Sequence, residues 1–168
     1  YALGLAQACQ QTGVQIFENS EVLESHKGEP ARLKLANGQV TARYVIFACN
    51  GYIDSLETRV AARVMPINNY IIATQPLEEG LAKSLIANDV AVADSKFVIN
   101  YYRLSADNRL LFGGGESYSF QFPQDIKAFV RKPMLQIYPQ LKDIPIDYGW
   151  GGTLGITLNR MPYFARLA

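Results

Sequence analysis

The sequence predicts an α+β fold with two lobes, and three kinds of stretch carry this prediction. Residues 44–49 form an unbroken apolar run that stops at Asn50-Gly51, as a strand buried on both faces does. Asn37-Gly38 and the polar segment 105–108 each separate two β-rich stretches and therefore mark antiparallel hairpins. Residues 125–138 carry apolar side chains at helical spacing.

The first lobe is expected to span residues 1–64. It opens with a helix that ends at Gly13, a residue suited to the left-handed conformation that stops a helix. The Asn37-Gly38 hairpin leads into the buried strand, and Pro66 closes the helical segment that follows it. The expected helices are residues 1–11 and 55–64, and the expected strands are 14–18, 22–25, 32–35 and 44–49.

The second lobe, residues 65–143, is expected to be built on an antiparallel sheet. Gly113-Gly114-Gly115 does not lie between a strand and a helix, so it predicts a flexible or bulged strand end rather than a phosphate cradle. Residues 144–168 are expected to return toward the first lobe, as a strand over 146–153 and then irregular chain. The other expected elements are strands at 69–75, 90–93, 98–104 and 109–113 and helices at 78–86 and 125–138, the last interrupted near Pro133.

The composition is that of an ordinary soluble domain, with 49% hydrophobic and 18% charged residues and a net charge of +1. No basic block exceeds two residues, which argues against nucleic acid or an anionic membrane as a partner. No apolar run approaches the roughly 18 residues of a membrane span, and no signal peptide is evident. Cys9 and Cys49 lie far apart in apolar surroundings, as reduced cysteines of a cytoplasmic protein do. Both ends of the chain lie inside apolar patterns, which predicts a central fragment of a longer protein.

The candidate acids and bases are few. His26, the single histidine, stands in a polar turn, and no serine–histidine–aspartate set or metal cluster is visible. Ten tyrosines and Trp150 suit an aromatic pocket in which a cofactor does the chemistry, although core packing is the favoured role for any single aromatic. Ligands of open α/β sheets bind beyond the carboxyl ends of strands, where Ala48, Cys49 and Gly51 would let a cofactor approach the backbone. The alternative for that stretch is a core strand followed by a turn.

Several of these stretches together resemble the D-amino-acid-oxidase superfamily of FAD-dependent oxidoreductases, and within it the gamma-glutamylputrescine oxidase branch. In that superfamily the buried strand usually ends Ala-Thr-Gly beside the FAD. The amino-terminal Gly-x-Gly-x-x-Gly turn and the glycine-rich loop near the carboxyl end, both typical of the superfamily, are missing from this chain. The stretches that carry the resemblance are GVQIFE (13–18), SEV (20–22), YVIFACNG (44–51), PINNYIIATQP (66–76), RLLFGG (109–114) and WGGTLGITLNRMP (150–162).

The resemblance implies that FAD is the cofactor and that one lobe holds it while an antiparallel sheet forms the substrate lobe. It does not identify a catalytic base. The residues that it places near the cofactor are Val22, Ala48, Cys49, Asn50, Gly51 and Thr157. Those that it places near the substrate are Tyr102, Trp150, Gly152, Leu154 and Arg160.

Departures from the pattern bear on the substrate. Leu154 stands where amino-acid oxidases of this group often carry the arginine that pairs with the substrate carboxylate, and an apolar side chain cannot form that ion pair. We therefore expect a small-molecule amine such as gamma-glutamylputrescine, with hydride passing to the flavin and oxygen as the acceptor. Arg160 would suit a more distant carboxylate, or it is a surface arginine. Asn159 replaces an aspartate that is usual in the superfamily.

Two alternatives stay open from the sequence. Without the pyrophosphate-binding turn, the chain would be a catalytically inactive substrate-domain module that binds FAD weakly or not at all. A third possibility keeps the class of enzyme but makes the protein an FAD-dependent amino-acid oxidase or dehydrogenase.

Overall fold

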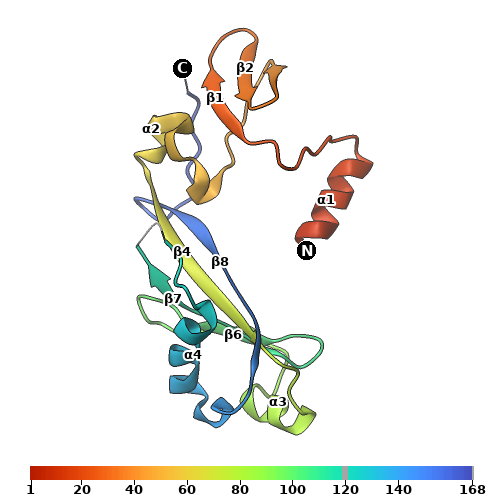
Figure 1. The fold of residues 1–168 in the computed structure, drawn as a ribbon, viewed down its shortest axis with the longest axis vertical. Coiled ribbons are helices and arrows are strands. Elements are labelled where there is room, and N and C mark those ends of the chain that lie inside the picture. Colours follow the sequence, from red (N-terminus) through yellow and green to blue (C-terminus); the bar gives the residue numbers. More distant parts are fainter. Residues whose placement is uncertain (119–120, 168) are drawn as a thin grey trace. The chain divides into compact units, whose positions relative to one another are not determined.

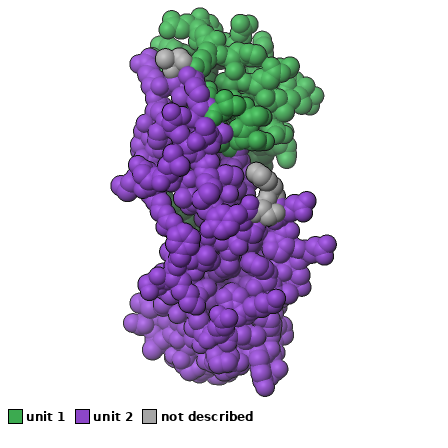
Figure 2. Space-filling model, turned by 90° about the vertical axis from the view of Figure 1, so that its left-hand side faces the viewer, with its two compact units in different colours: residues 1–48, 53–58 green, residues 49–52, 59–168 purple. Residues whose placement is uncertain are grey.

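The computed structural model describes residues 1–118 and 121–167 and confirms the α+β fold class, with helices and two antiparallel sheets (Figure 1). The chain forms two compact units, coloured separately in Figure 2. Unit 1 consists of residues 1–48 and 53–58, and unit 2 of residues 49–52 and 59–168. The lobe boundaries expected after residues 64 and 143 stay a prediction. Within the described residues, none of the helices combines the length and the apolar character that crossing a membrane requires.

Unit 1 contains the predicted amino-terminal helix and hairpin. Gly13 follows the helix with φ of +89°, which confirms the left-handed stop. The hairpin is also confirmed, but its two-residue turn is Ala36-Asn37 instead of Asn37-Gly38, because Leu35 pairs with Gly38, the first residue of β3. The elements of this unit are α1 (Ala2–Gln11), β1 (Val22–His26), β2 (Ala31–Leu35), β3 (Gly38–Ala42) and the 3-10 helix η2 (Asp54–Glu57), and the strands form one sheet in the order β1-β2-β3.

Two strands predicted in this unit are wrong. Residues 14–18 and 44–49 have no strand assignment, and Tyr44 and Ile46 are 75% and 89% exposed. A strand exists only when its backbone N–H and C=O groups find partners on a neighbouring strand. No described residue of the chain pairs with either stretch. The apolar pattern of 44–49 therefore indicated a tendency to be buried, but not which segment would lie beside it.

Unit 2 is organised around the larger sheet, in which every pair of neighbours is antiparallel. Its order is β5-β6-β7-β4-β8, so β4 and β8, far apart in sequence, lie side by side along their full lengths (Figure 1). The strands are β4 (Val64–Thr74), β5 (Val92–Ala93), β6 (Tyr101–Leu104), β7 (Leu110–Ser117) and β8 (Ile146–Thr157). The helical segments are η1 (Asn50–Tyr52), α2 (Thr58–Ala61), α3 (Glu79–Leu85), α4 (Ile126–Ile137) and η3 (Pro139–Leu141).

The hydrophobic core of unit 2 lies on one face of this sheet. Tyr70 and Ile72 of β4 and Phe112 of β7 are fully buried there, and Val130 and Met134 of α4 pack against them. Successive side chains of a strand point to opposite faces, so these strands offer alternate residues to the core. Full burial of such side chains stabilises the fold by about 1.5–3 kcal/mol each.

Two further details correct the prediction. α4 runs without interruption through Pro133, because Val130 before it and Met134 after it are both fixed in the core, which offsets the missing proline N–H. β8 continues to Thr157 instead of ending at residue 153, because β4 also begins earlier than expected and pairs with residues 154–157. Residue 168, the last of the expected return segment, lies outside the described residues.

The start of α4 gives a first testable prediction. The Asp125 carboxylate accepts a hydrogen bond of 2.9 Å from the backbone N–H of Ala128, so it caps the helix. We expect Asp125→Ala to lower the free energy of unfolding by about 0.5–2 kcal/mol. Denaturant unfolding measures this loss. Asp125→Asn, which preserves the acceptor, should retain most of the stability, and an equal loss in both variants would contradict the capping role.

Candidate functional site

The face of the larger sheet opposite the core carries a row of side chains from four strands, and we call it the open face. Because Tyr70 and Ile72 enter the core, Ile71 between them points the other way. Ile71 pairs with Gly113 of β7 on one side and with Trp150 of β8 on the other. Tyr101 of β6 pairs with Gly113 and completes the row. Residues matched in register across a sheet share a face.

Three predicted substrate residues follow one another on the open face of β8. Trp150, Gly152 and Leu154 occupy alternate positions of the strand, and the two larger side chains are 45% and 42% exposed. A Cβ placed on Gly152 would meet only the Tyr52 hydroxyl within 4 Å, at 3.8 Å, so there is room above this glycine. Asn69 of β4 lies opposite Gly152. The structure thus brings these three residues together, as the sequence predicted for a common site.

Tyr101 lies across Gly113 and reaches β4. Its hydroxyl donates a short hydrogen bond to Oδ1 of Asn69. A Cβ on Gly113 would lie only 2.1 Å from Cζ of Tyr101, so the ring occupies the space that any other side chain would need. Burial and the nearby negative charge of Glu116 raise the pKa of Tyr101, against the opposing effect of the Asn69 hydrogen bond. The phenol is therefore neutral at physiological pH.

A β-bulge at the triple glycine turns Glu116 toward the open face. Three residues of β4, from Asn69 to Ile71, match four residues of β7, from Gly113 to Glu116, and Gly115 has φ of +79°. The extra residue reverses the alternation, so Ser117 lies on the core side, where its hydroxyl is 3.0 Å from the Tyr70 hydroxyl. Glu116 consequently points to the side that carries Tyr101. The bulged strand end predicted for the glycine run is confirmed.

Two of the predicted cofactor residues, Asn50 and Gly51, lie against the outer edge of β8. Oδ1 of Asn50 accepts a hydrogen bond of 2.7 Å from the backbone N–H of Gly155, and the Tyr52 hydroxyl accepts one of 2.8 Å from that of Thr153. The bond from Thr153 lowers the pKa of Tyr52. A Cβ on Gly51 would lie 2.8 Å from the Thr153 side chain, so glycine is needed here for close packing on β8. These contacts cover a strand edge whose amides would otherwise lack partners in the sheet.

Thr157 and Arg160 belong to the turn that follows β8. The Thr157 hydroxyl donates to the carbonyl oxygen of Met161 at 2.7 Å, and Oδ1 of Asn159 accepts from the Met161 N–H at 3.1 Å. The Arg160 guanidinium lies 5.0 Å from the centre of the Phe97 ring. Asn159 thus has a structural role in this turn that does not require the charge of an aspartate.

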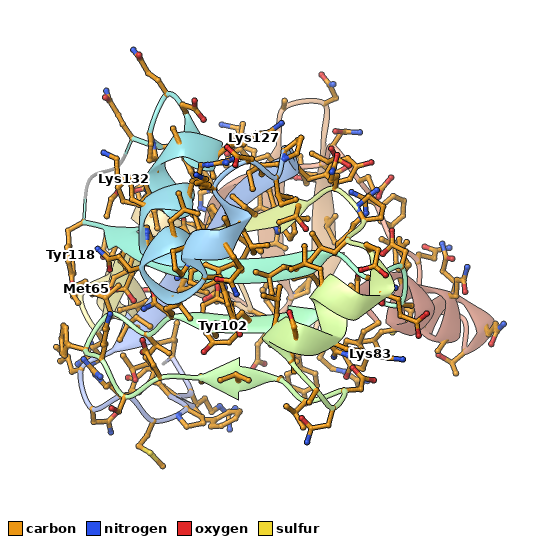
Figure 3. All side chains as sticks on the ribbon, turned by 90° about the horizontal axis from the view of Figure 1, so that it is seen from below. Met65, Lys83, Tyr102, Tyr118, Lys127 and Lys132 are labelled. Carbon is orange, nitrogen blue, oxygen red and sulfur yellow. The ribbon has the colours of Figure 1, made fainter. Side chains whose placement is uncertain are left out.

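Tyr102, the remaining substrate candidate, lies on the core side of β6. Its ring stacks on Phe112 with centroids 5.4 Å apart and meets Tyr138 edge to face at the same distance. Figure 3 shows Tyr102 on its strand in the region of α3 and α4. Burial, helped by Tyr102, raises the pKa of Tyr138 to about 12. Tyr102 therefore packs within the core, and its neighbour Tyr101 faces the open side.

The other predicted cofactor residues lie at three separate places. Val22 pairs with Leu35 in the hairpin sheet of unit 1. Ala48 is exposed at the end of a segment of the same unit. Cys49 belongs to unit 2 and is a partly buried free thiol. The cofactor roles of these three residues stay predictions.

Sequence reasoning did not single out Asn69, Tyr101 and Glu116, which the structure brings together on the open face. The glycine run could have indicated the position of Glu116, because a bulge there changes the face of the sheet on which the following residues lie. Tyr101 and Tyr102 are chemically alike, and only the packing of β6 distinguishes them. Across the described ranges, no three histidine, cysteine, aspartate or glutamate side chains are grouped as metal ligands.

Comparison with known proteins identifies related chains. "Gamma-glutamylputrescine oxidoreductase" of Escherichia coli K12 is 44% identical over 167 residues, which are 99% of this chain and 39% of that protein. "Probable oxidoreductase OrdL" of Haemophilus influenzae is 43% identical over 173 residues, covering all of this chain and 39% of that protein. The chain thus spans about two fifths of the length of these relatives.

Solved structures share the fold at lower sequence identity. L-proline dehydrogenase from P. horikoshii superimposes with a TM-score of 0.73 at 20% identity, covering 99% of this chain and 46% of that one. Glycine oxidase from Geobacillus kaustophilus gives a TM-score of 0.73 at 21% identity, over 96% of this chain and 43% of that one. The family model described as "FAD dependent oxidoreductase" (DAO) matches residues 1–168. The chain therefore belongs to the DAO family of FAD-dependent oxidoreductases, as its sequence motifs indicated.

Proposed function

We propose that the larger sheet forms the substrate site of an FAD-dependent enzyme that oxidises the C–N bond of an amine such as gamma-glutamylputrescine. The observation that carries this proposal is the chemistry of the open face. It presents Trp150, Leu154 and Tyr101 together with one carboxylate, Glu116, and the basic side chain two residues along β6 from Tyr101, Arg103, is already paired with Asp89. Such a surface suits a cationic amine better than an amino acid. The printed name of the Escherichia coli relative supports the same class of substrate.

The residues present fit a flavin beside β8. Trp150 and Leu154 expose apolar surface and Gly152 leaves room between them, so a flat ring system has a surface on which to pack. Asn50 and Gly51, predicted near the cofactor, contact the same strand. When bound, FAD would supply the acceptor for the two electrons released from the C–N bond, and we propose oxygen as the final acceptor.

The chain's own contribution is binding and orientation. Trp150 and Ile71 supply an apolar surface, and the Tyr101 hydroxyl is held by Asn69 in one position. Holding the substrate in one orientation against this surface lowers the activation free energy, because its translational and rotational entropy is lost on binding and not in the reaction step. Tyr101 takes the place of Tyr102 in this proposal because, of these two neighbours, Tyr101 is the one on the open face.

The substrate class is tested by anaerobic mixing of the whole protein, purified with its flavin, with gamma-glutamylputrescine. We expect the flavin absorbance to bleach with this amine, and more slowly with glycine or proline. Admission of oxygen should then restore the colour and produce hydrogen peroxide. Bleaching by the amino acids alone would overturn the proposed substrate in favour of an amino-acid oxidase or dehydrogenase.

Leu154→Arg is expected to shift the preference toward amines that carry an α-carboxylate. The new guanidinium would stand on the open face two residues from Gly152, where a bidentate pair with a carboxylate could form. Such a charged hydrogen-bonded pair is worth about 1.5–3 kcal/mol, so kcat/KM for amino acids should rise about 10- to 100-fold relative to gamma-glutamylputrescine.

Leu158→Arg is the matched control, because Leu158 is 85% exposed and lies beyond the end of β8. It adds the same charge without placing it on the open face, so the ratio of the two kcat/KM values should stay at the wild-type level. An equal shift in both variants would show that net charge, and not position 154, sets the preference.

A further inference from the structure

Glu116 is a carboxylate in an apolar and aromatic setting. It pairs in register with Asn69, next to the row of Tyr101, Ile71 and Trp150, and its residue is partly buried. Within residues 1–118 and 121–167, none of the ion pairs found involves Glu116. A carboxylate that is partly removed from water is stabilised by a positive partner.

The local structure fixes this carboxylate on the open face. The bulge orients it, and Gly115 is required there because its φ is +79° and a Cβ would lie 2.5 Å from Cε1 of Phe129. The Tyr101 hydroxyl donates to Asn69 and is close enough to Glu116 for the negative charge to raise its pKa. Three neighbouring strands therefore bring one negative and two neutral polar groups to the same place.

We propose that Glu116 is the residue that binds the ammonium group of the substrate, and that it makes the site selective for amines without an α-carboxylate. This inference rests on the proposed function. Aliphatic amines, like the lysine side chain with its pKa near 10.4, are protonated at neutral pH and carry the positive charge that would pair with Glu116. An α-carboxylate would bring a second negative charge beside Glu116, and the two negative charges would repel each other. Leu154, which stands where amino-acid oxidases of this group often carry an arginine, offers no positive charge to the carboxylate.

The variant to test is Glu116→Gln, which retains the shape and removes the charge. In the whole protein with its flavin, we expect KM for gamma-glutamylputrescine to rise about 10- to 100-fold, as for loss of a charged hydrogen bond, with a smaller change in kcat. Relative kcat/KM for glycine and proline should rise. Glu79→Gln is the control, because Glu79 is an exposed helix residue paired with Lys83 and should leave all these values unchanged.

A binding measurement separates recognition from turnover. n-Butylammonium should perturb the flavin spectrum of the wild-type protein, and its Kd should rise about 10- to 100-fold in Glu116→Gln. n-Butanol, which has the same chain and no charge, should bind both proteins equally. Equal Kd values of n-butylammonium for the wild-type and Glu116→Gln proteins would overturn the inference.

The pKa of Tyr101 gives a second reading that needs neither flavin nor substrate. Loss of the Glu116 charge should lower this pKa, measured from the ¹³Cζ shift of Tyr101 and assigned with Tyr101→Phe. An unchanged pKa would show that Glu116 does not face Tyr101, and the inference would fail. If no amine reduces the flavin of the wild-type protein, the proposed function is wrong. If amines reduce the wild-type flavin and Glu116→Gln has the wild-type KM, only the role of Glu116 is wrong.

Discussion

Gly113→Ala is expected to disrupt the proposed substrate site and to lower the free energy of unfolding by about 1–3 kcal/mol, the usual cost of overpacking. The added Cβ would lie 2.1 Å from Cζ and 2.6 Å from the hydroxyl oxygen of Tyr101, far inside normal contact. The ring must leave its position over β7, and its hydrogen bond to Asn69 is lost with it. Binding of n-butylammonium should therefore weaken about tenfold or more, because the wall beside Glu116 is displaced.

Thermal or denaturant unfolding measures the first effect, and titration of the flavin spectrum measures the second. Gly38→Ala is the matched control, since Gly38 also lies in a strand and a Cβ there would meet no atom within 4 Å. The double variant Gly113→Ala/Tyr101→Ala should recover part of the lost stability, because it removes the clash. It should not recover the binding of n-butylammonium. Wild-type stability and binding in the single variant would contradict the placement of Tyr101.

Met134→Ala is expected to have the largest effect on stability, a loss of about 2–5 kcal/mol. Met134 is fully buried in the core between α4 and the sheet, together with Phe112 and Val130. Truncation removes its packing contacts and leaves a cavity that the surrounding strands cannot fill by collapsing. Because Pro133 already removes one hydrogen bond of α4, the helix depends on this burial more than a helix without an internal proline would.

Urea unfolding of the wild-type and variant proteins checks this prediction. Gln136→Ala is the control on the same helix, because Gln136 is exposed and alanine favours the helix. Its effect should be within about 0.5 kcal/mol of zero. A loss below about 1 kcal/mol for Met134→Ala would contradict the observed packing, since this is well under the range for a fully buried methionine.

Local signals in the sequence predicted the local structure well. The hairpin around Asn37 and the Gly13 helix stop depend on backbone preferences of a few adjacent residues, and both are confirmed. The stretch 44–49 shows where such signals end. Its apolar run predicts burial, yet pairing depends on strands elsewhere, and none of the described residues forms a strand beside it.

The candidate site shows the same division. Trp150, Gly152 and Leu154 were predicted from one contiguous motif, and their alternate spacing on β8 places them on one face. The sequence predicted Tyr102 for the substrate site, but it does not tell which of the adjacent residues Tyr101 and Tyr102 faces the core. The stacking of Tyr102 on Phe112 decides that, and Phe112 comes from a different strand.

The sequence by itself determined the class of fold, the family and the motif on β8, because composition, turn residues and contiguous motifs are local properties of the chain. Only the tertiary structure decided that Asn69, Tyr101 and Glu116 meet on the open face. The physical reason is that their meeting depends on the register of three strands and on the bulge at Gly114-Gly115, which reverses the side on which Glu116 lies.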